Sequence, residues 1–500
     1  MTTPLRLRLR RIRRHVVYAL AIVLVGVAVL VGTVSQLLPL AERHPDKVAA
    51  WLSARAGQPV RFDQLDTRWT RRGPLLALQG LRIGEGQGLR IGEAEVLVSM
   101  YAGLLPGQSL TELRLRGLAL ELQRADDGRW SVQGLPQSGH GDPLESLRRL
   151  GELQVIGGRL TVDAPSLQLH TELPRIDLRL RVNGQRLRVG ARAWADEKTQ
   201  PLTAVLDFER KRGDGQVWLG ADPADFSAWS SLLQFGGARL QQGTGEFNAW
   251  VDVRDSRLVM VTTDADLHDV QLQGAPLADG KRPQMTLQNL ELRARWRWVK
   301  GGWRADASRL RIGMDGSEQT LDGLLVAGGE HMALAGDNID ATALLRGLAL
   351  TDRIDPGLRS WLHAAAPQVR MTRVRFSGER AGALRFEGDL EDIRFAAAGH
   401  APGLSGVGGH FQGDADGFRL DLQPTRVMQF DWPSGFGVRH DVHLAGSVVG
   451  WRDEAGGWRI GTPALRVQGT DYAADVRGGV WFQGNGTRPW LELAAKLDDV

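Results

Sequence analysis

The chain has 500 residues, no cysteine and a formal net charge of +4. The absence of cysteine excludes disulfides, thiol catalysis and cysteine-based zinc sites. The six arginines within the first fifteen residues exceed this net charge, so the remainder is slightly acidic and lacks the basic face of a nucleic-acid binder.

The first predicted element is a transmembrane anchor. Val16 to Val34 is a run of nineteen residues without a charge, and as a helix it spans roughly 28 Å, the thickness of a bilayer's hydrocarbon core. Because the arginines precede this run, the positive-inside rule places the N-terminus in the cytoplasm. We therefore predict a cytoplasmic tail over 1–15 and an anchor over 16–40. The apolar anchor positions are Val16, Leu20, Val23, Leu24, Val27, Leu30 and Val34.

A cleaved secretory signal is the alternative interpretation of this segment. The apolar run is longer than the usual 7 to 15 residues or so of a signal's hydrophobic region, and no small-x-small cleavage site follows it. The uncleaved anchor is therefore favoured. With either interpretation, residues from Glu42 onward leave the cytoplasm.

Helical patterns are few beyond the anchor. Glu42 to Ala56 has apolar residues at helical spacing and stops before Gly57, a typical C-terminal glycine. The other predicted helical stretches are Pro143 to Leu150, Pro223 to Phe235, and Asp340 to Ala366 with a break at Asp355-Pro356.

From Val60 onward the dominant period is two, which is typical of β-strands with one apolar face and one arginine-rich face. Gly117 shifts the phase of one such strand by a residue, as a bulge or turn does. Glycine turns precede Trp130, Trp303 and Trp458, each of which opens the next strand. The apolar-face candidates are Leu113, Leu115, Leu118, Leu120, Ile176, Leu178, Leu180, Trp296, Trp298, Val374 and Phe376.

Too few helices are predicted to cover these faces. Other strands must cover them, as in a sandwich or a curled sheet, or an apolar ligand must do so. Alternation of apolar and polar residues looks the same in both cases, so each candidate is either a ligand contact or ordinary core. On the order of 25 strands at about 4.8 Å each would extend ~120 Å in one sheet, which predicts an elongated, repeat-like structure.

No catalytic pattern is present. His440 and His443 flank Asp441, but residues three apart on a strand point to opposite faces, so a metal site there is not favoured. We therefore expect no enzymatic activity, no cofactor and no metal.

The order of several weak motifs resembles one family. An early set includes Trp51-Leu52, Gly57-Gln58-Pro59-Val60, Trp69 and Gly73-Pro74, and a recurring strand, strand, Asp-Gly-x-Trp element covers Leu113 to Trp130. These features are similar to the start of the YhdP proteins of the AsmA-like superfamily, relatives of AsmA and TamB. Later similar positions are Pro223, Trp229, Gly243, Gly245, Trp250, Pro356, Leu358, Trp361 and Leu362. The chain departs from the family at Ala365-Ala366-Pro367, where a glycine is expected near the helix end.

The resemblance implies an inner-membrane protein with a long periplasmic, antiparallel-rich β-sheet, curled into an apolar groove for phospholipid acyl chains. Such proteins are implicated in moving phospholipids toward the outer membrane and in maintaining its barrier. The implied parts are an AsmA-like module with a membrane-proximal helix over 41–140 and groove repeats over 141–500. Since strand-like residues reach the end of the sequence without a cap, we expect this chain to be the N-terminal portion of something longer.

Two other functions remain open at the level of sequence. The chain could be a non-enzymatic envelope scaffold that offers a sheet edge to outer-membrane proteins during their assembly. It could also be a polysaccharide-acting enzyme, but that requires two acids converging in a cleft, and the acids here fall mainly at turns and outer faces. Phospholipids and the inner membrane are the expected partners, with the outer membrane or envelope proteins as further ones and no nucleic acid.

Overall fold

The structure is a computed structural model, and it divides the chain into two compact units. Unit 1 is residues 1–197 and 205–210, and unit 2 is residues 198–204 and 211–500. The structure describes residues 39–56, 59–84, 89–99, 111–125, 130–132, 152–165, 169–196, 198–380, 382–435, 437–453, 456–483 and 488–498, with scattered positions between 18 and 36. The predicted boundary at residue 140 and the predicted helix Pro143 to Leu150 lie outside the described residues.

The seven predicted anchor positions, Val16, Leu20, Val23, Leu24, Val27, Leu30 and Val34, also lie outside the described residues. Among the residues that are described, no helix is both long enough and apolar enough to cross a bilayer. The anchor therefore stays a sequence-based prediction.

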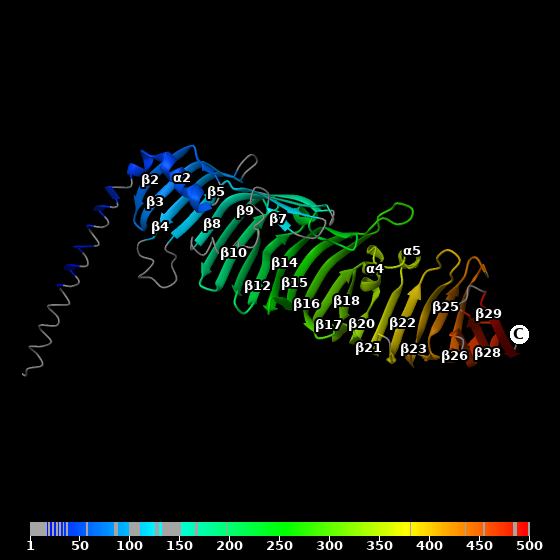
Figure 1. Ribbon diagram of the computed structural model, residues 1–500. Helices are drawn as coiled ribbons and strands as arrows, with labels where there is room; N and C mark the ends of the chain where they lie inside the picture. The colour runs from blue at the N-terminus through cyan, green and yellow to red at the C-terminus, as the bar shows by residue number, and fades with distance from the viewer. Residues whose placement is uncertain are drawn as a thin grey trace, which may run out of the picture. The chain divides into compact units, whose positions relative to one another are not determined.

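Unit 1 combines a short helix with a series of strands (Figure 1). These elements are α2 (Pro45–Ala56), β1 (Val60–Arg61), β2 (Gln64–Thr70), β3 (Gly73–Ile83), β4 (Leu89–Val98), β5 (Thr111–Arg116), β6 (Ala119–Arg124), β7 (Trp130–Val132), β8 (Glu152–Ala164), β9 (Leu169–Asn183) and β10 (Arg186–Trp194). Strand β11 (Leu202–Glu209) contributes residues to both units.

The strands of unit 1 pair mainly in antiparallel fashion, but β5 and β6 both run parallel to β8. Gly117 lies between β5 and β6 with a φ of 64°, a left-handed conformation that glycine adopts without strain. The break predicted at this residue is thus a turn. It lets the short strands β5 and β6 both pair with the long strand β8.

The predicted helix over Glu42 to Ala56 begins three residues late, at Pro45. Glu42 instead ties the preceding segment to β2, because its carboxylate accepts hydrogen bonds of 2.6 Å from both the backbone N–H and the hydroxyl of Thr67. Leu52 of α2 packs against the buried core of this unit. That core consists of Val60, Leu78, Leu81, Leu89, Ile91, Ala94, Leu115, Leu118 and Val155.

Unit 2 is an antiparallel array in which strands follow one another in chain order (Figure 1). Its elements are β12 (Asp214–Asp225), η2 (Ser227–Trp229), β13 (Gln234–Phe235), β14 (Ala238–Arg254), β15 (Arg257–Gln273), β16 (Gln284–Val299), β17 (Gly302–Met314), β18 (Ser317–Leu321), β19 (Leu324–Gly329), β20 (His331–Asp340), α4 (Thr342–Leu350), α5 (Pro356–Ala365), β21 (Gln368–Glu379), β22 (Leu384–Phe395), β23 (Gly403–Asp414), β24 (Gly417–Leu422), β25 (Val427–Asp431), β26 (Arg439–Arg452), β27 (Trp458–Gln468), β28 (Ala473–Phe482) and β29 (Trp490–Asp498). The prediction of a mainly β protein with few short helices is confirmed.

Two helix predictions in unit 2 have opposite outcomes. The break predicted at Asp355-Pro356 is confirmed, since the Asp355 carboxylate caps α5 by accepting a hydrogen bond from the Leu358 N–H, and Pro356 occupies the first turn. The helix predicted over Pro223 to Phe235 is wrong. β12 continues to Asp225 through its pairing with β14, and only Ser227 to Trp229 turns as a 3-10 helix.

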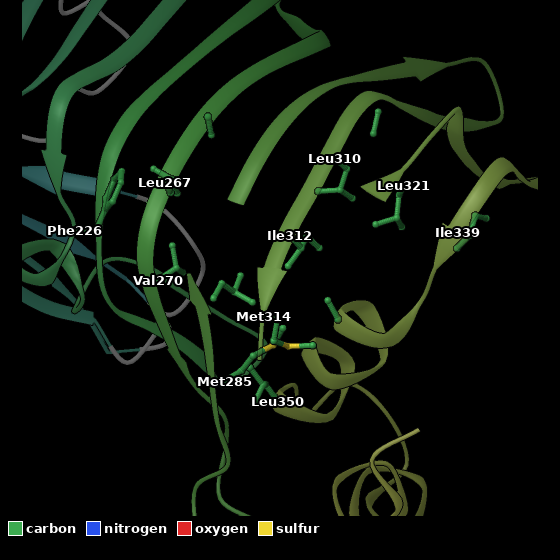
Figure 2. Packing of buried hydrophobic residues seen from close by; sticks show 14 of the residues in the cluster. Phe226, Leu267, Val270, Met285, Leu310, Ile312, Met314, Leu321, Ile339 and Leu350 are labelled. Carbon is green, nitrogen blue, oxygen red and sulfur yellow. The ribbon is translucent and has the colours of Figure 1, made fainter. Parts of the chain in front are cut away.

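The core of unit 2 lies where α4 packs against the strands. Figure 2 shows Met285, Met314 and Leu350 close together beside a helix. Leu310 and Ile312 lie further along β17, the strand that carries Met314. All of these side chains are buried, at 8% exposure or less. The helices therefore cover one end of the apolar face.

Candidate functional site

One row of paired residues runs across unit 2 without a polar side chain. In an antiparallel sheet, residues directly opposite each other point to the same face, so the register of successive strands traces one line across it. The line passes through fifteen strands, from β12 to β29. Its members, called the apolar row below, are Val217, Val251, Val261, Trp296, Ala305, Val326, Leu334, Phe376, Phe386, Gly413, Phe418, Gly450, Ile460, Val480 and Leu491.

The side chains of the apolar row are not buried. Trp296 is 37% exposed and Leu491 is 60% exposed, Gly450 is buried, and the others are half-buried. A chain of half-buried apolar side chains this long is unusual on a soluble surface, where exposed apolar residues are normally scattered singly.

Two glycines of the row make room for phenylalanine rings. A Cβ atom at Gly413 would overlap the ring of Phe386, and one at Gly450 would overlap the ring of Phe418. Each ring thus lies over the bare backbone of the neighbouring strand. Because glycine has no side chain, the phenylalanine ring of the neighbouring strand occupies this position and the face stays apolar there.

A second apolar row runs on the same face, four residues further along strand β22. It links Leu390 to neighbouring strands on both sides and again contains only apolar residues and glycine. Its members are Ile339, Met371, Leu390, Gly409, Leu422, Gly446, Leu465, Val476 and Ala495. The apolar face is therefore a band several residues wide.

The opposite face of the same strands is ionic. Arg293 on β16 binds Asp264 on β15 at 3.1 Å, and Arg297 binds Asp306 on β17 at 3.0 Å. Burial raises the pKa of the Asp306 carboxyl, but hydrogen bonds from Arg304 and Arg297 outweigh this and hold that pKa below its ordinary value. The Asp306 carboxylate therefore stays ionised at neutral pH. Ion pairs between neighbouring strands balance the charge of this face locally.

Exposure changes along a single strand. On β16, Met285 and Leu287 are 8% and 4% exposed beside the helices, whereas Trp296 and Trp298 are 37% and 42% exposed at the other end. The rings of Trp296 and Trp303 stack with centroids 4.3 Å apart. We call the helix-covered end, with Met285, the closed end, and the tryptophan end the open end.

The candidates predicted in unit 1 share one face but are mostly covered. Leu113 and Leu180 pair with the same residue of β8, from its two sides, and so do Leu115 and Leu178. The members of each pair therefore point to the same face. Leu115 and Leu118 are buried in the core of this unit, and Leu113, Leu120 and Leu178 pack against it. Ile176 is 9% exposed and Leu180 is half-buried.

The candidates predicted in unit 2 divide between the two ends. Trp296 and Phe376 belong to the apolar row, and Trp298 lies beside it at the open end. Val374 is 6% exposed and belongs to the core. Phe386, Phe418, Gly413 and Gly450 were not among the predicted site residues. Alternation does not mark a glycine beneath a ring, because that fit depends on the register of two strands.

No metal centre is visible in the described part of the chain, where no three histidines, aspartates or glutamates converge. His440 pairs with Phe430 and His443 with Val427. These histidines lie an odd number of residues apart on β26, so they face opposite sides of the sheet as predicted.

Comparison with known proteins points to one family. No curated protein matches the chain. The family model described as YhdP protein matches residues 1–500, the whole of the sequence. The resemblance read from the ordered motifs is thereby confirmed, and the chain belongs to the YhdP family.

Proposed function

We propose that this chain is a non-enzymatic lipid-transfer scaffold that carries phospholipid acyl chains along the apolar face of unit 2. The observation that carries the proposal is the apolar row, which crosses fifteen strands without a polar side chain. Membership of the YhdP family supports it.

The length of the row favours transfer over binding at a single site. At about 4.8 Å per strand, fourteen steps cover about 67 Å. Two opposed leaflets of acyl chains fill a bilayer core about 30 Å thick, so one chain needs about 15 Å. The row therefore offers several successive positions to one acyl chain.

The energetics favour movement along such a surface. Exposing apolar surface to water costs about 25 cal/mol per Å², so a charged or polar step would hold a lipid back. Because neighbouring positions in the row are all apolar, an acyl chain exchanges one apolar contact for another. No covalent chemistry is required.

In this proposal residues 16–34 hold the chain in the inner membrane with the N-terminus in the cytoplasm, and the remainder lies in the periplasm. Phospholipids then move between the inner and outer membranes and support the outer-membrane barrier. The charge-free run and the arginines before it support this placement.

Site-specific photocrosslinking tests the proposal on the full chain in cells. A photoreactive benzoylphenylalanine at Phe376 or at Leu491 is expected to capture phospholipid, identified by mass spectrometry. The matched controls are Ser377 and Glu492, the next residues on the same strands, which face the other side. Equal capture at both members of a pair would contradict the proposal.

A substitution distinguishes the transfer scaffold from an assembly scaffold. Phe376→Arg places a charge in the row and is expected to lower lipid crosslinking at Leu491 and to weaken the outer-membrane barrier, whereas Ser377→Arg leaves both unchanged. A folded Phe376→Arg variant with normal barrier function, together with no lipid capture in the parent chain, would favour the assembly scaffold.

A further inference from the structure

Two arginines face each other at the open end of unit 2. Arg254 is the last residue of β14 and Arg257 is the first of β15, and the two lie opposite each other in the register of these strands. Like charges in this arrangement repel each other and destabilise a sheet. Within the described residues, no carboxylate forms an ion pair with either arginine.

Another opposed pair of arginines in the same sheet is neutralised. Arg297 on β16 lies opposite Arg304 on β17. The Asp306 carboxylate accepts hydrogen bonds from both guanidinium groups, at 3.0 Å and 2.7 Å. An acid placed in this way removes the repulsion between two facing arginines. At the turn between β14 and β15, an anion from outside the chain would have the same effect.

Lys211 lies at the same edge of the sheet. It belongs to the turn that precedes β12, and this turn is fastened to the turn between β14 and β15, because the Ser256 N–H donates a hydrogen bond of 2.8 Å to the Gly213 carbonyl. Asp214 is the acid in this turn, and its carboxylate accepts a hydrogen bond of 3.2 Å from the Asp255 N–H. The two turns therefore bring a third cation close to the arginine pair.

Lys300 extends the set of cations to the next turn. It lies between β16 and β17, and the pairing of β15 with β16 reaches Met260 and Arg297. Three residues further along each strand, the same register brings Lys300 to the level of Arg257. All these cations are exposed, and none forms an ion pair within the part of the chain that the structure describes. The set is called the basic edge below and consists of Lys211, Arg254, Arg257 and Lys300.

The apolar face of unit 2 extends up to the basic edge. Val253 lies two residues beyond Val251 of the apolar row and pairs with Leu258, so both point to the apolar face. Trp298 lies two residues beyond Trp296 of the row. Leu258 is 41% exposed and Trp298 is 42% exposed. Exposed apolar side chains thus adjoin the basic edge, and this combination fits an amphiphile with an anionic head.

The order of side chains along β16 indicates how such an amphiphile is oriented. From the closed end to the open end, Met285 is buried, Leu292 is half-buried, Trp298 is exposed, and Lys300 follows in the turn. Membrane proteins show the same order from the hydrocarbon core to the lipid phosphates, with tryptophan at the interface and lysine or arginine beside the head groups. Acyl chains therefore fit between the closed end and the tryptophans, with the head group at the basic edge.

We propose that the basic edge binds the phosphate of a phospholipid, with the acyl chains on the apolar face and directed toward the closed end. A phosphate between Arg254 and Arg257 accepts hydrogen bonds from both guanidinium groups and removes their repulsion. Lys211 and Lys300 add positive charge on either side. The inference rests on the proposed function, to which it adds a head-group site and the orientation of the lipid.

Photocrosslinking of the purified full chain in a nonionic detergent tests the proposal, with benzoylphenylalanine in place of Trp298. Phosphatidylglycerol and diacylglycerol with identical acyl chains compete in one sample, and mass spectrometry gives the ratio of the two captured lipids. Phosphatidylglycerol is expected in at least tenfold excess. The double variant Arg254→Gln, Arg257→Gln is expected to lower this ratio at least fivefold, because it weakens capture of the phospholipid and leaves capture of diacylglycerol unchanged.

Two control variants separate charge at this site from charge in general. The double variant Arg254→Lys, Arg257→Lys keeps both charges and is expected to retain most of the preference. Lys281→Gln is the matched control, because Lys281 has an 83% exposed side chain in the loop between β15 and β16, at the other end of these strands. This variant is expected to give the ratio of the parent chain.

The outcomes separate a failure of this inference from a failure of the proposed function. Equal capture of the two lipids by the parent chain would overturn the head-group site, while the capture itself would support lipid transfer. A preference that survives the glutamine double variant would also overturn it, since the phosphate would then bind elsewhere. Loss of the preference in millimolar inorganic phosphate would assign the basic edge to soluble phosphate. Capture of neither lipid would overturn both proposals.

Discussion

The apolar faces of the two units are built from the same alternation but differ in exposure. In unit 1, Leu115 and Val155 are paired neighbours that are 7% and 2% exposed. In unit 2, Trp296 and Trp298 on the interior strand β16 are 37% and 42% exposed within an equally regular register. The difference lies in what covers the face. The chain's own side chains, including Leu52 of α2, cover it in unit 1, whereas in unit 2 the helices cover only the closed end.

The largest effect expected from this comparison is a difference between two arginine substitutions. Leu115→Arg buries an unpaired charge and is expected to destabilise unit 1 by at least about 4 kcal/mol. Phe376→Arg is expected to cost about 1 kcal/mol, because a half-buried arginine extends its charged head into water. Hydrogen exchange of the full chain measures both, through the amides of β4, β5 and β8 for the first variant and of β20 to β22 for the second.

A similar loss of protection in both variants would contradict the comparison. It would mean that the apolar row is as tightly packed as the core of unit 1. The row would then be part of a structural core, and the case for a lipid-facing surface would fail.

The closed end of unit 2 depends on one buried cation. Arg359 of α5 is 6% exposed and its guanidinium donates hydrogen bonds to three carbonyl oxygens, those of Ala349 at 2.9 Å, Pro276 at 2.9 Å and Ala275. Arg359→Met would leave these carbonyls unpaired and is expected to cost about 2 to 4 kcal/mol, releasing the two helices from the sheet.

The expected result of Arg359→Met is faster hydrogen exchange in α4 and α5 with unchanged protection in β26 to β28. Arg353→Met is the control, since Arg353 lies between the same helices with its side chain 74% exposed. If Arg359→Met leaves the helices as protected as in the parent chain, apolar packing alone holds the cover in place.

Unit 1 is expected to lose stability in acid through a buried carboxylate. Glu152 is 3% exposed and accepts hydrogen bonds from Arg179 at 2.7 Å and Gln154 at 2.6 Å. Burial raises the pKa of Glu152, but these hydrogen bonds outweigh it and lower the pKa below its ordinary value. Because the folded state binds this proton more weakly than the unfolded state, the stabilisation is complete above the unfolded pKa of about 4.3 and is lost as the pH falls through the folded pKa.

Urea unfolding of the full chain between pH 6 and pH 3, followed through the exchange of β8 amides, checks this dependence. Glu152→Gln is expected to lower the free energy of unfolding at pH 6 by about 1.5 to 3 kcal/mol, the usual contribution of a hydrogen bond to a charged group. The variant is also expected to lose less of its remaining stability than the parent chain as the pH falls. Glu492→Gln, on the exposed strand β29, is the control. If Glu152→Gln loses as much stability in acid as the parent chain, other groups cause the acid sensitivity.

Local signals in the sequence predicted the elements they control. The carboxylate of Asp355 and the fixed φ of Pro356 act within one turn, so the start of α5 was predicted correctly. The helix predicted over Pro223 to Phe235 failed because partners distant in sequence decide that segment. Ala224 pairs with Gly245 on β14, and Phe226 and Trp229 are buried at 6% and 4% exposure.

The sequence predicted which residues lie on the apolar face, but not which of them are exposed. Alternation identified Trp296 and Phe376 as apolar-face residues, but it identified Leu115 and Val374 in the same way, and these are core. Exposure depends on what lies above a strand, which alternation does not encode. The fit of Gly450 beneath Phe418 depends on the register of β24 with β26, which pairs two residues more than thirty positions apart in sequence.

The smallest effect expected concerns the cover at the closed end. Ala366 ends α5 with a φ of 44°, a left-handed conformation that costs a residue with a Cβ atom about 1 kcal/mol and that glycine adopts freely. This is the position near which the family pattern leads us to expect glycine. Ala366→Gly is therefore expected to stabilise the α5 end by about 0.5 to 1 kcal/mol, after allowing for the greater freedom of glycine in the unfolded chain.

The sign of this effect is the informative result. Ala364→Gly, two residues earlier and inside the helix, is expected to destabilise α5 by about 0.5 to 1 kcal/mol, because there glycine gains nothing from the backbone conformation. Hydrogen exchange at the Ala366 end of α5 separates the two variants. If both lower protection, packing against the sheet fixes the helix end, and the closed end is then held by its core contacts more than by the geometry of its turn.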